Sequence, residues 1–224
     1  VQGETSSPSF GLTIVTHGYQ WSSGTPPWLI PMGQAISDRN GGQANTPVYQ
    51  LTIGKTKGAP AVTCFGPAPC FGATFDANDL SRISSLVVVV EWSALACLHV
   101  IEPAPYVCTE NETSTQLIGD FVFDWLYNKD ARTKKFLTQV PVHLIGHSRG
   151  SGVISRIAYD LGLFGIWTDQ LTFLDPHPVY AAGDFAPTAW SNVIYAENYR
   201  QEVPDHGPKG ISIDGTFDRD LTGI

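Results

Sequence analysis

The chain contains the stretch Val142-His143-Leu144-Ile145-Gly146-His147-Ser148-Arg149-Gly150-Ser151-Gly152-Val153-Ile154, in which an apolar run leads into Gly-His-Ser-Arg-Gly and a helical pattern follows. A strand, a tight turn with a serine at its apex and a helix together form a nucleophile elbow. Such a turn lifts the Ser148 hydroxyl to a place where a general base can reach it. Gly146 and Gly150 lack the Cβ atoms that would collide in the turn. The alternative is a chance occurrence of the motif in a chain with 22 glycines.

Length and charge limit the class of protein. A chain of 224 residues fits a single α/β domain over residues 1–224, although two small domains would also fit. The net charge of -8 and the absence of a basic stripe argue against nucleic acid as a partner. No apolar stretch approaches the length of a membrane span. The first residue is Val1 and no signal-peptide pattern follows, which indicates a mature or excised segment.

The four cysteines predict an oxidising compartment. Each neighbouring pair brackets a short loop, so Cys64 with Cys70 and Cys97 with Cys108 are the economical pairings, although four cysteines allow three connectivities. Neither spacing is typical of a zinc site. We therefore expect a secreted protein, with four buried thiols in a cytosolic protein as the alternative.

Apolar runs alternate with helical patterns along the chain. The predicted helices cover residues 28–38, 113–128 and 149–161, and the stretch 54–78 reads as an excursion with some β character. The predicted strands cover residues 10–16, 48–53, 86–92, 140–145, 170–174, 192–196 and 210–217. This alternation predicts an α/β fold, with a mostly parallel central sheet and helices on both faces.

Polar residues follow three of the predicted strands. His17-Gly18-Tyr19 follows the first strand, Ser148 follows the central one, and Asp175 follows the next. In an open parallel sheet the active site lies at the carboxyl ends of the strands. The order of serine and then aspartate also fits a hydrolase triad. The alternative for Asp175-Pro176 is a simple turn-initiating dipeptide.

Four segments resemble the α/β-hydrolase superfamily, and within it the pancreatic-type lipases and their phospholipase relatives. They are Ile14-Val15-Thr16-His17-Gly18-Tyr19, Val89-Val90-Glu91-Trp92, Val142 to Ser148, and Leu171-Thr172-Phe173-Leu174-Asp175-Pro176. The resemblance implies that Ser148 attacks an ester carbonyl and that Asp175 orients the catalytic histidine. It also implies that the backbone N–H groups of Tyr19 and Arg149 form the oxyanion hole.

The position of the histidine base in this sequence departs from the family pattern. In that pattern the histidine follows the last strand, further from the acid than any histidine lies here. Of the six histidines, His206 follows Asp175 at a useful distance, in the loop Pro204-Asp205-His206-Gly207-Pro208. We predict His206 as the base. The alternatives are a solvated turn histidine at this position and a catalytic histidine beyond Ile224 in a longer chain.

The predicted function is a secreted serine carboxylester hydrolase, of lipase or esterase type, that acts on a small-molecule or lipid ester. A transient contact with a lipid surface is compatible with this function. No cofactor is needed, and no metal is expected because Asp214, Asp218 and Asp220 lack the spacing of a calcium loop. Two alternatives stay open: a cutinase-like polyester hydrolase, and a non-catalytic binding module of this fold that has lost its base.

Overall fold

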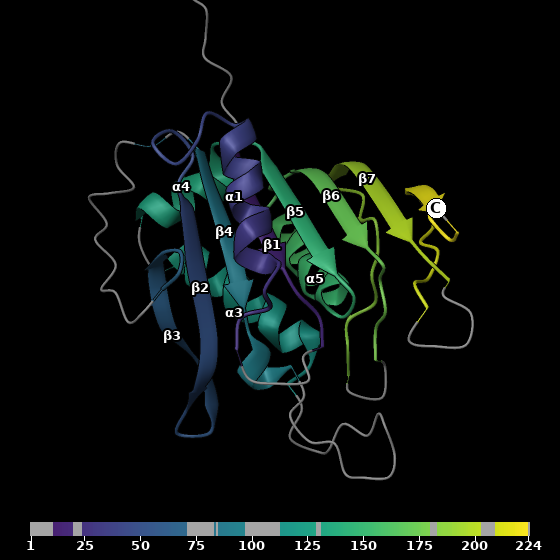
Figure 1. The fold of residues 1–224 in the computed structure, drawn as a ribbon, viewed down its shortest axis with the longest axis horizontal. Coiled ribbons are helices and arrows are strands. Elements are labelled where there is room, and N and C mark those ends of the chain that lie inside the picture. Colours follow the sequence, from purple (N-terminus) through teal and green to yellow (C-terminus); the bar gives the residue numbers. More distant parts are fainter. Residues whose placement is uncertain are drawn as a thin grey trace, which may run out of the picture.

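Two strands at the centre of the sheet are buried along their whole length. β1 (Gly11–Thr16) and β4 (Ser85–Glu91) are apolar runs with no alternation, which is typical of parallel strands covered on both faces. The computed structural model describes residues 11–19, 24–70, 83, 85–96, 113–128, 131–179, 183–202 and 209–223. Within these residues one sheet of eight strands has the order β3-β2-β4-β1-β5-β6-β7-β8 (Figure 1).

The elements follow one another in the alternation that the sequence predicts. After β1 come α1 (Leu29–Arg39), β2 (Val48–Thr56), β3 (Ala59–Pro67), β4, the short 3₁₀ helix η1 (Ser93–Leu95), α3 (Thr115–Asn128), α4 (Ala131–Thr138), β5 (Val142–His147), α5 (Gly150–Leu163), β6 (Thr168–Leu174), β7 (Val193–Arg200) and β8 (Phe217–Asp220). All neighbouring strands of this sheet pair in parallel except β2 and β3.

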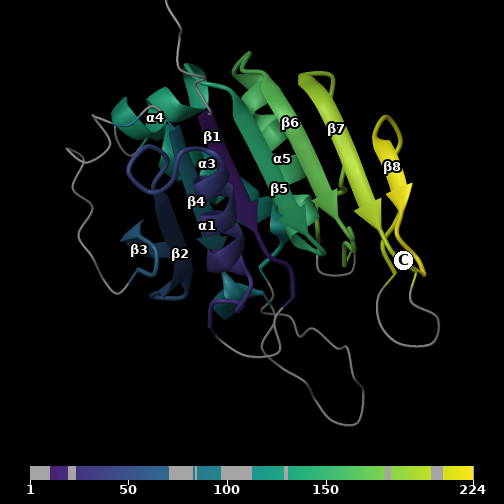
Figure 2. The same cartoon turned by 45° about the horizontal axis from the view of Figure 1, so that its top comes forward.

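Helices lie on both faces of the sheet. Helix α1 crosses one face over β1, β4 and β2, whereas α3, α4 and α5 lie on the other (Figures 1 and 2). The larger apolar core lies between the sheet and α3 and α5, and a smaller one lies under α1. The predicted α/β fold, with a mostly parallel central sheet and helices on both faces, is therefore confirmed. Every strand that carries a predicted site residue ends at the same edge of this sheet.

The last predicted strand is wrong in position. We expected it over residues 210–217, but β8 covers Phe217–Asp220 and pairs with β7 from Glu197 to Arg200. Ile211 instead donates its N–H to Pro176 O at 3.0 Å, and Ile213 is buried in the core. Ile211 thus bonds through its backbone to the loop after β6 and Ile213 packs into the core, and neither pairs with a strand.

Two further differences concern elements that the sequence signals weakly. Helix α4 was not expected, because its composition is mostly polar, yet Thr133, Phe136 and Leu137 are buried at helical spacing. The stretch 54–78 contains β3, which forms an antiparallel hairpin with β2 and carries the predicted Cys64–Cys70 disulfide. The other predicted pairing, Cys97 with Cys108, lies outside the described residues.

Candidate active site

Ser148 is the residue at the turn between β5 and α5, as the elbow motif predicts. Its φ of 54° is left-handed, a conformation that non-glycine residues adopt rarely. Its N–H donates to Leu174 O at 2.9 Å, which ties the turn to the end of β6. A Cβ on Gly146 would lie 2.5 Å from Gly150 O, and one on Gly150 would lie 2.6 Å from His17 O. Only glycine therefore fits at these two motif positions without a shift of the backbone.

Gly18 brings the loop after β1 directly against the serine. A Cβ at this position would lie 2.6 Å from Ser148 Cβ, 2.8 Å from Arg149 N and 2.9 Å from Ser148 Oγ. Tyr19, the next residue, carries one of the two N–H groups assigned to the oxyanion hole. The predicted oxyanion loop and the predicted nucleophile are therefore neighbours in space.

The segment that carries Gly18 is held by a buried histidine. His17 donates from Nδ1 to Gly18 O at 2.7 Å and accepts the Trp92 N–H at Nε2, at 3.0 Å. The indole of Trp92 donates back to His17 O at 2.9 Å. Burial lowers the pKa of His17 to about 4, so the ring is neutral at pH 7 and can accept this hydrogen bond. His17 thus fixes the end of β1 to the end of β4.

Asp175 is also a non-glycine residue with a left-handed φ, of 49°. Its N–H donates to Tyr199 O at 2.6 Å, and its Oδ1 accepts the Gln201 N–H at 3.0 Å. A Cβ on Gly210 would lie 2.3 Å from Asp175 Oδ1. Asp175 thus contacts the chain on both sides of residues 203–208, the segment that contains His206.

His206 itself lies outside the described residues. Its approach to Asp175 is therefore a prediction, supported by the two flanking contacts of Gln201 and Gly210. Within the described part of the chain, Asp175 Oδ2 accepts no hydrogen bond from a histidine.

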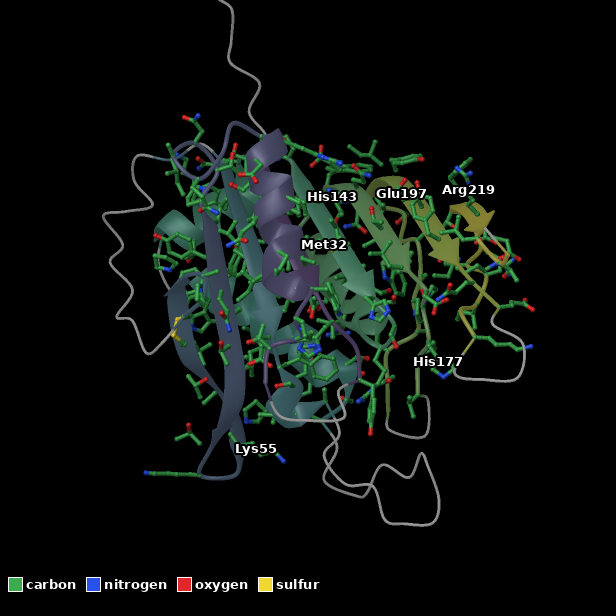
Figure 3. All side chains as sticks on the ribbon, viewed as in Figure 1. Met32, Lys55, His143, His177, Glu197 and Arg219 are labelled. Atoms are coloured by element: carbon green, nitrogen blue, oxygen red, sulfur yellow. A yellow bond between two sulfur atoms is a disulfide. The ribbon has the colours of Figure 1, made fainter. Side chains whose placement is uncertain are left out.

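The described histidines hold other positions. His177 is half-buried beyond the carboxyl ends of the strands and donates from Nδ1 to Lys209 O at 3.0 Å (Figure 3). His143 lies inside β5, where its Nε2 is 2.8 Å from Thr172 Oγ1, and burial lowers its pKa to about 4. His147 packs edge-on against Trp28, and its buried Nδ1 has no hydrogen-bond partner. Burial lowers the pKa of His147, while the charge of Asp175 acts in the opposite direction.

Arg149 follows the nucleophile, and its side chain is fully enclosed. The guanidinium forms two hydrogen bonds of 2.7 Å with the carboxylate of Asp184, and the Arg149 side chain is 1% exposed. The guanidinium also donates to Ala96 O and Thr113 O, so this buried cation is bound by the protein itself and is not offered to a substrate. Sequence reasoning assigned a role to the backbone of Arg149 and missed its side chain and Asp184. An arginine directly after the serine was the available signal.

No group of three or more metal-binding side chains occurs among the described residues. Within the same residues, no helix is both long and apolar enough to cross a membrane. A cavity of about 300 Å³ opens at the opposite edge of the sheet, beside Thr13, Pro141 and Asp169. That cavity is remote from Ser148 and plays no part in the candidate site.

The chain was compared with protein families, curated proteins and solved structures. No protein-family model matches the chain, and no curated protein matches its sequence. A solved structure described as "the putative cell surface hydrolase from Lactobacillus plantarum WCFS1" is similar, with 13% identity and a TM-score of 0.48. The similarity covers 96% of this chain and 83% of that chain. At this identity and TM-score it carries no information about substrate or mechanism.

Proposed function

We propose that this protein is a serine carboxylester hydrolase of lipase or esterase type, secreted from the cell. The observation that carries the proposal is the left-handed turn at Ser148, with Gly18 packed against its Cβ and Oγ. A serine held this way at the carboxyl edge of a parallel sheet meets the geometric requirement of a nucleophile elbow. The Cys64–Cys70 disulfide supports the oxidising compartment.

In the proposed mechanism Ser148 Oγ attacks the ester carbonyl while His206 takes its proton. The negative charge on the carbonyl oxygen is stabilised by the N–H groups of Tyr19 and Arg149. His206 then donates the proton to the leaving alcohol, and an acyl-enzyme remains on Ser148. Water hydrolyses this ester by the same route, with His206 again acting as base and then as acid. Asp175 orients the imidazole and stabilises its charged form.

The first experiment tests the nucleophile with a fluorophosphonate probe. We expect the wild-type protein to be labelled on a single serine, and Ser148→Ala to abolish labelling. Ser155→Ala is the matched control, because Ser155 is a buried serine of α5, the helix that follows the turn, and its Oγ donates to Ala186 O. Failure of the folded wild-type protein to react would contradict the proposal and favour the non-catalytic binding module.

The second experiment tests the base. His206→Ala is expected to lower kcat by about a thousandfold or more, as for other triad histidines. His177→Ala is the control, since this histidine binds Lys209 O and lies outside the proposed triad. Unchanged turnover in His206→Ala would show that another histidine serves.

Turnover of p-nitrophenyl esters with increasing acyl length defines the substrate class. A lipase prefers long acyl chains and an esterase short, soluble ones. Release of monomers from a polyester film would instead identify the cutinase-like alternative.

A further inference from the structure

The side chain of Arg149 uses its donors entirely within the protein. Nε donates to Asp184 Oδ2 and Nη2 to Asp184 Oδ1, each at 2.7 Å. Nη1 donates to Ala96 O at 3.1 Å, and Nη2 also reaches Thr113 O at 3.4 Å. This arrangement is a bidentate pair with two carbonyl acceptors added, which is the geometry that arginine forms and lysine does not.

The carboxylate of Asp184 is equally occupied. Besides Arg149, Oδ1 accepts the Thr115 N–H at 3.1 Å and Oδ2 accepts the Val179 N–H at 2.8 Å. The pair therefore connects four places: the start of α5, the start of α3, the end of η1 and the segment after Asp175.

Stability alone does not explain an ion pair at this position. Removing two charges from water is costly, and well-packed apolar side chains of similar volume often stabilise a fold as well or better. The Asp184 side chain is fully buried, and that of Arg149 is nearly so. The backbone N–H of the same Arg149 is the group assigned to the oxyanion hole. Its position there depends on how firmly the turn is held.

We propose that the Arg149–Asp184 pair is a positioning device for the oxyanion hole. This inference rests on the proposed function. The side chain of Arg149 anchors its own backbone, so that the N–H is held at the place where negative charge develops on the substrate oxygen. A donor fixed in advance needs no reorganisation during the reaction, which is the source of its catalytic effect. Arg149 therefore has two roles: its backbone N–H donates to the substrate oxygen, and its side chain holds that N–H in position.

The test is the double variant Arg149→Met/Asp184→Leu, which removes both charges and leaves neither one buried without a partner. We expect it to fold, to lower kcat by about 10- to 100-fold and to leave KM within about threefold of wild type. The rate of fluorophosphonate labelling should fall in parallel, because the same N–H groups stabilise that reaction. Arg149→Lys keeps the charge but loses the planar fork. The kcat and the labelling rate of Arg149→Lys should lie between those of the double variant and those of the wild type.

The matched control is Arg156→Met/Asp120→Leu. Arg156 lies on α5 and pairs with Asp120 of α3 and with Asp160 one turn further along α5. The hydrogen bonds and ion pairs that the structure describes for Arg156 and Asp120 do not involve the turn at Ser148. This control should leave kcat and the labelling rate within about twofold of wild type, even if the melting temperature falls. If Arg149→Lys has a higher kcat than the double variant but a similar melting temperature, the loss of kcat in the double variant is due to lost positioning and not to lost stability.

The outcomes distinguish this inference from the proposed function. Wild-type protein that neither reacts with the probe nor hydrolyses esters overturns both. Active wild-type protein with an equally active, folded double variant overturns the positioning role and leaves the hydrolase standing. If the double variant does not fold, Arg149→Lys decides in the same way, by its kcat relative to the control.

Discussion

At the scale of single residues, backbone strain gathers at the candidate site. Three non-glycine residues of the described chain have a positive φ, and two of them are Ser148 and Asp175. Each such conformation costs about 1–3 kcal/mol and persists only where surrounding contacts enforce it. Here the contacts are backbone hydrogen bonds to Leu174 and Tyr199, at the ends of neighbouring strands. The strain therefore supports the assignment of both residues to one site.

Gly18→Ala should disable the site without unfolding the protein. The new Cβ would collide with Ser148 Cβ at 2.6 Å and Arg149 N at 2.8 Å. Because a displacement of about 1 Å in reacting groups can cost a hundredfold, we expect kcat to fall by about that factor. Steady-state ester hydrolysis measures the change, and thermal unfolding checks the fold.

Gly54→Ala is the comparison for that variant. Gly54 lies in the β2–β3 hairpin, where a Cβ would meet a methyl group of Thr63 at 3.0 Å. Its kcat should equal that of wild type. An active Gly18→Ala protein would show that the loop after β1 does not form the oxyanion hole.

At the scale of elements, strands with long apolar runs were predicted well, whereas elements with short patterns of mixed polarity were not. β1, β4, β5 and β6 appear where continuous apolar runs predict buried parallel strands. β8 was misplaced because Ile211 and Ile213 alternate as in a strand but pack against the core without pairing with a strand. Periodicity reports that a residue is buried, and it does not report which partner covers it.

The Cys64–Cys70 disulfide should stabilise the edge hairpin and leave catalysis unchanged. It closes a short loop, with a sequence separation of 6, at the end of β3. On the chain-entropy estimate, its loss in Cys64→Ala/Cys70→Ala should lower the free energy of unfolding by about 2 kcal/mol. Denaturant titration measures this loss. A large fall in kcat would instead indicate that the hairpin supports the site.

At the scale of the whole molecule, buried neutral histidines make stability depend on pH. Burial lowers the pKa of His17 and His143 to about 4, from 6.5 in the unfolded chain. The unfolded chain therefore binds more protons between these values, so stability is lost as pH falls from 6.5 to about 4. Each histidine contributes at most about 3 kcal/mol to this loss. Melting temperatures between pH 7 and 4.5 should fall accordingly.

His143→Gln isolates one of the two contributions. The amide can still reach Thr172 but does not titrate. As the pH is lowered, the melting temperature of the variant should therefore fall less steeply than that of the wild type. Burial raises the pKa of Asp160 to about 7, which acts in the opposite direction over this range. Because both proteins contain Asp160, its effect cancels in the comparison. Parallel pH curves would contradict the assignment of a low pKa to His143.

The sequence by itself determined the central parallel strands, the turn at Ser148 and the order of the candidate site residues along the chain. These follow from local patterns: apolar runs, a glycine-flanked serine, and polar residues at strand ends. Only the tertiary structure decided that Asp184, 35 residues from Arg149, pairs with it, and that Gly210 lies against Asp175. It also decided that His17 is buried and neutral. Such contacts depend on which loops, distant in sequence, lie together in the folded chain, and the periodicity within one segment carries no information about them.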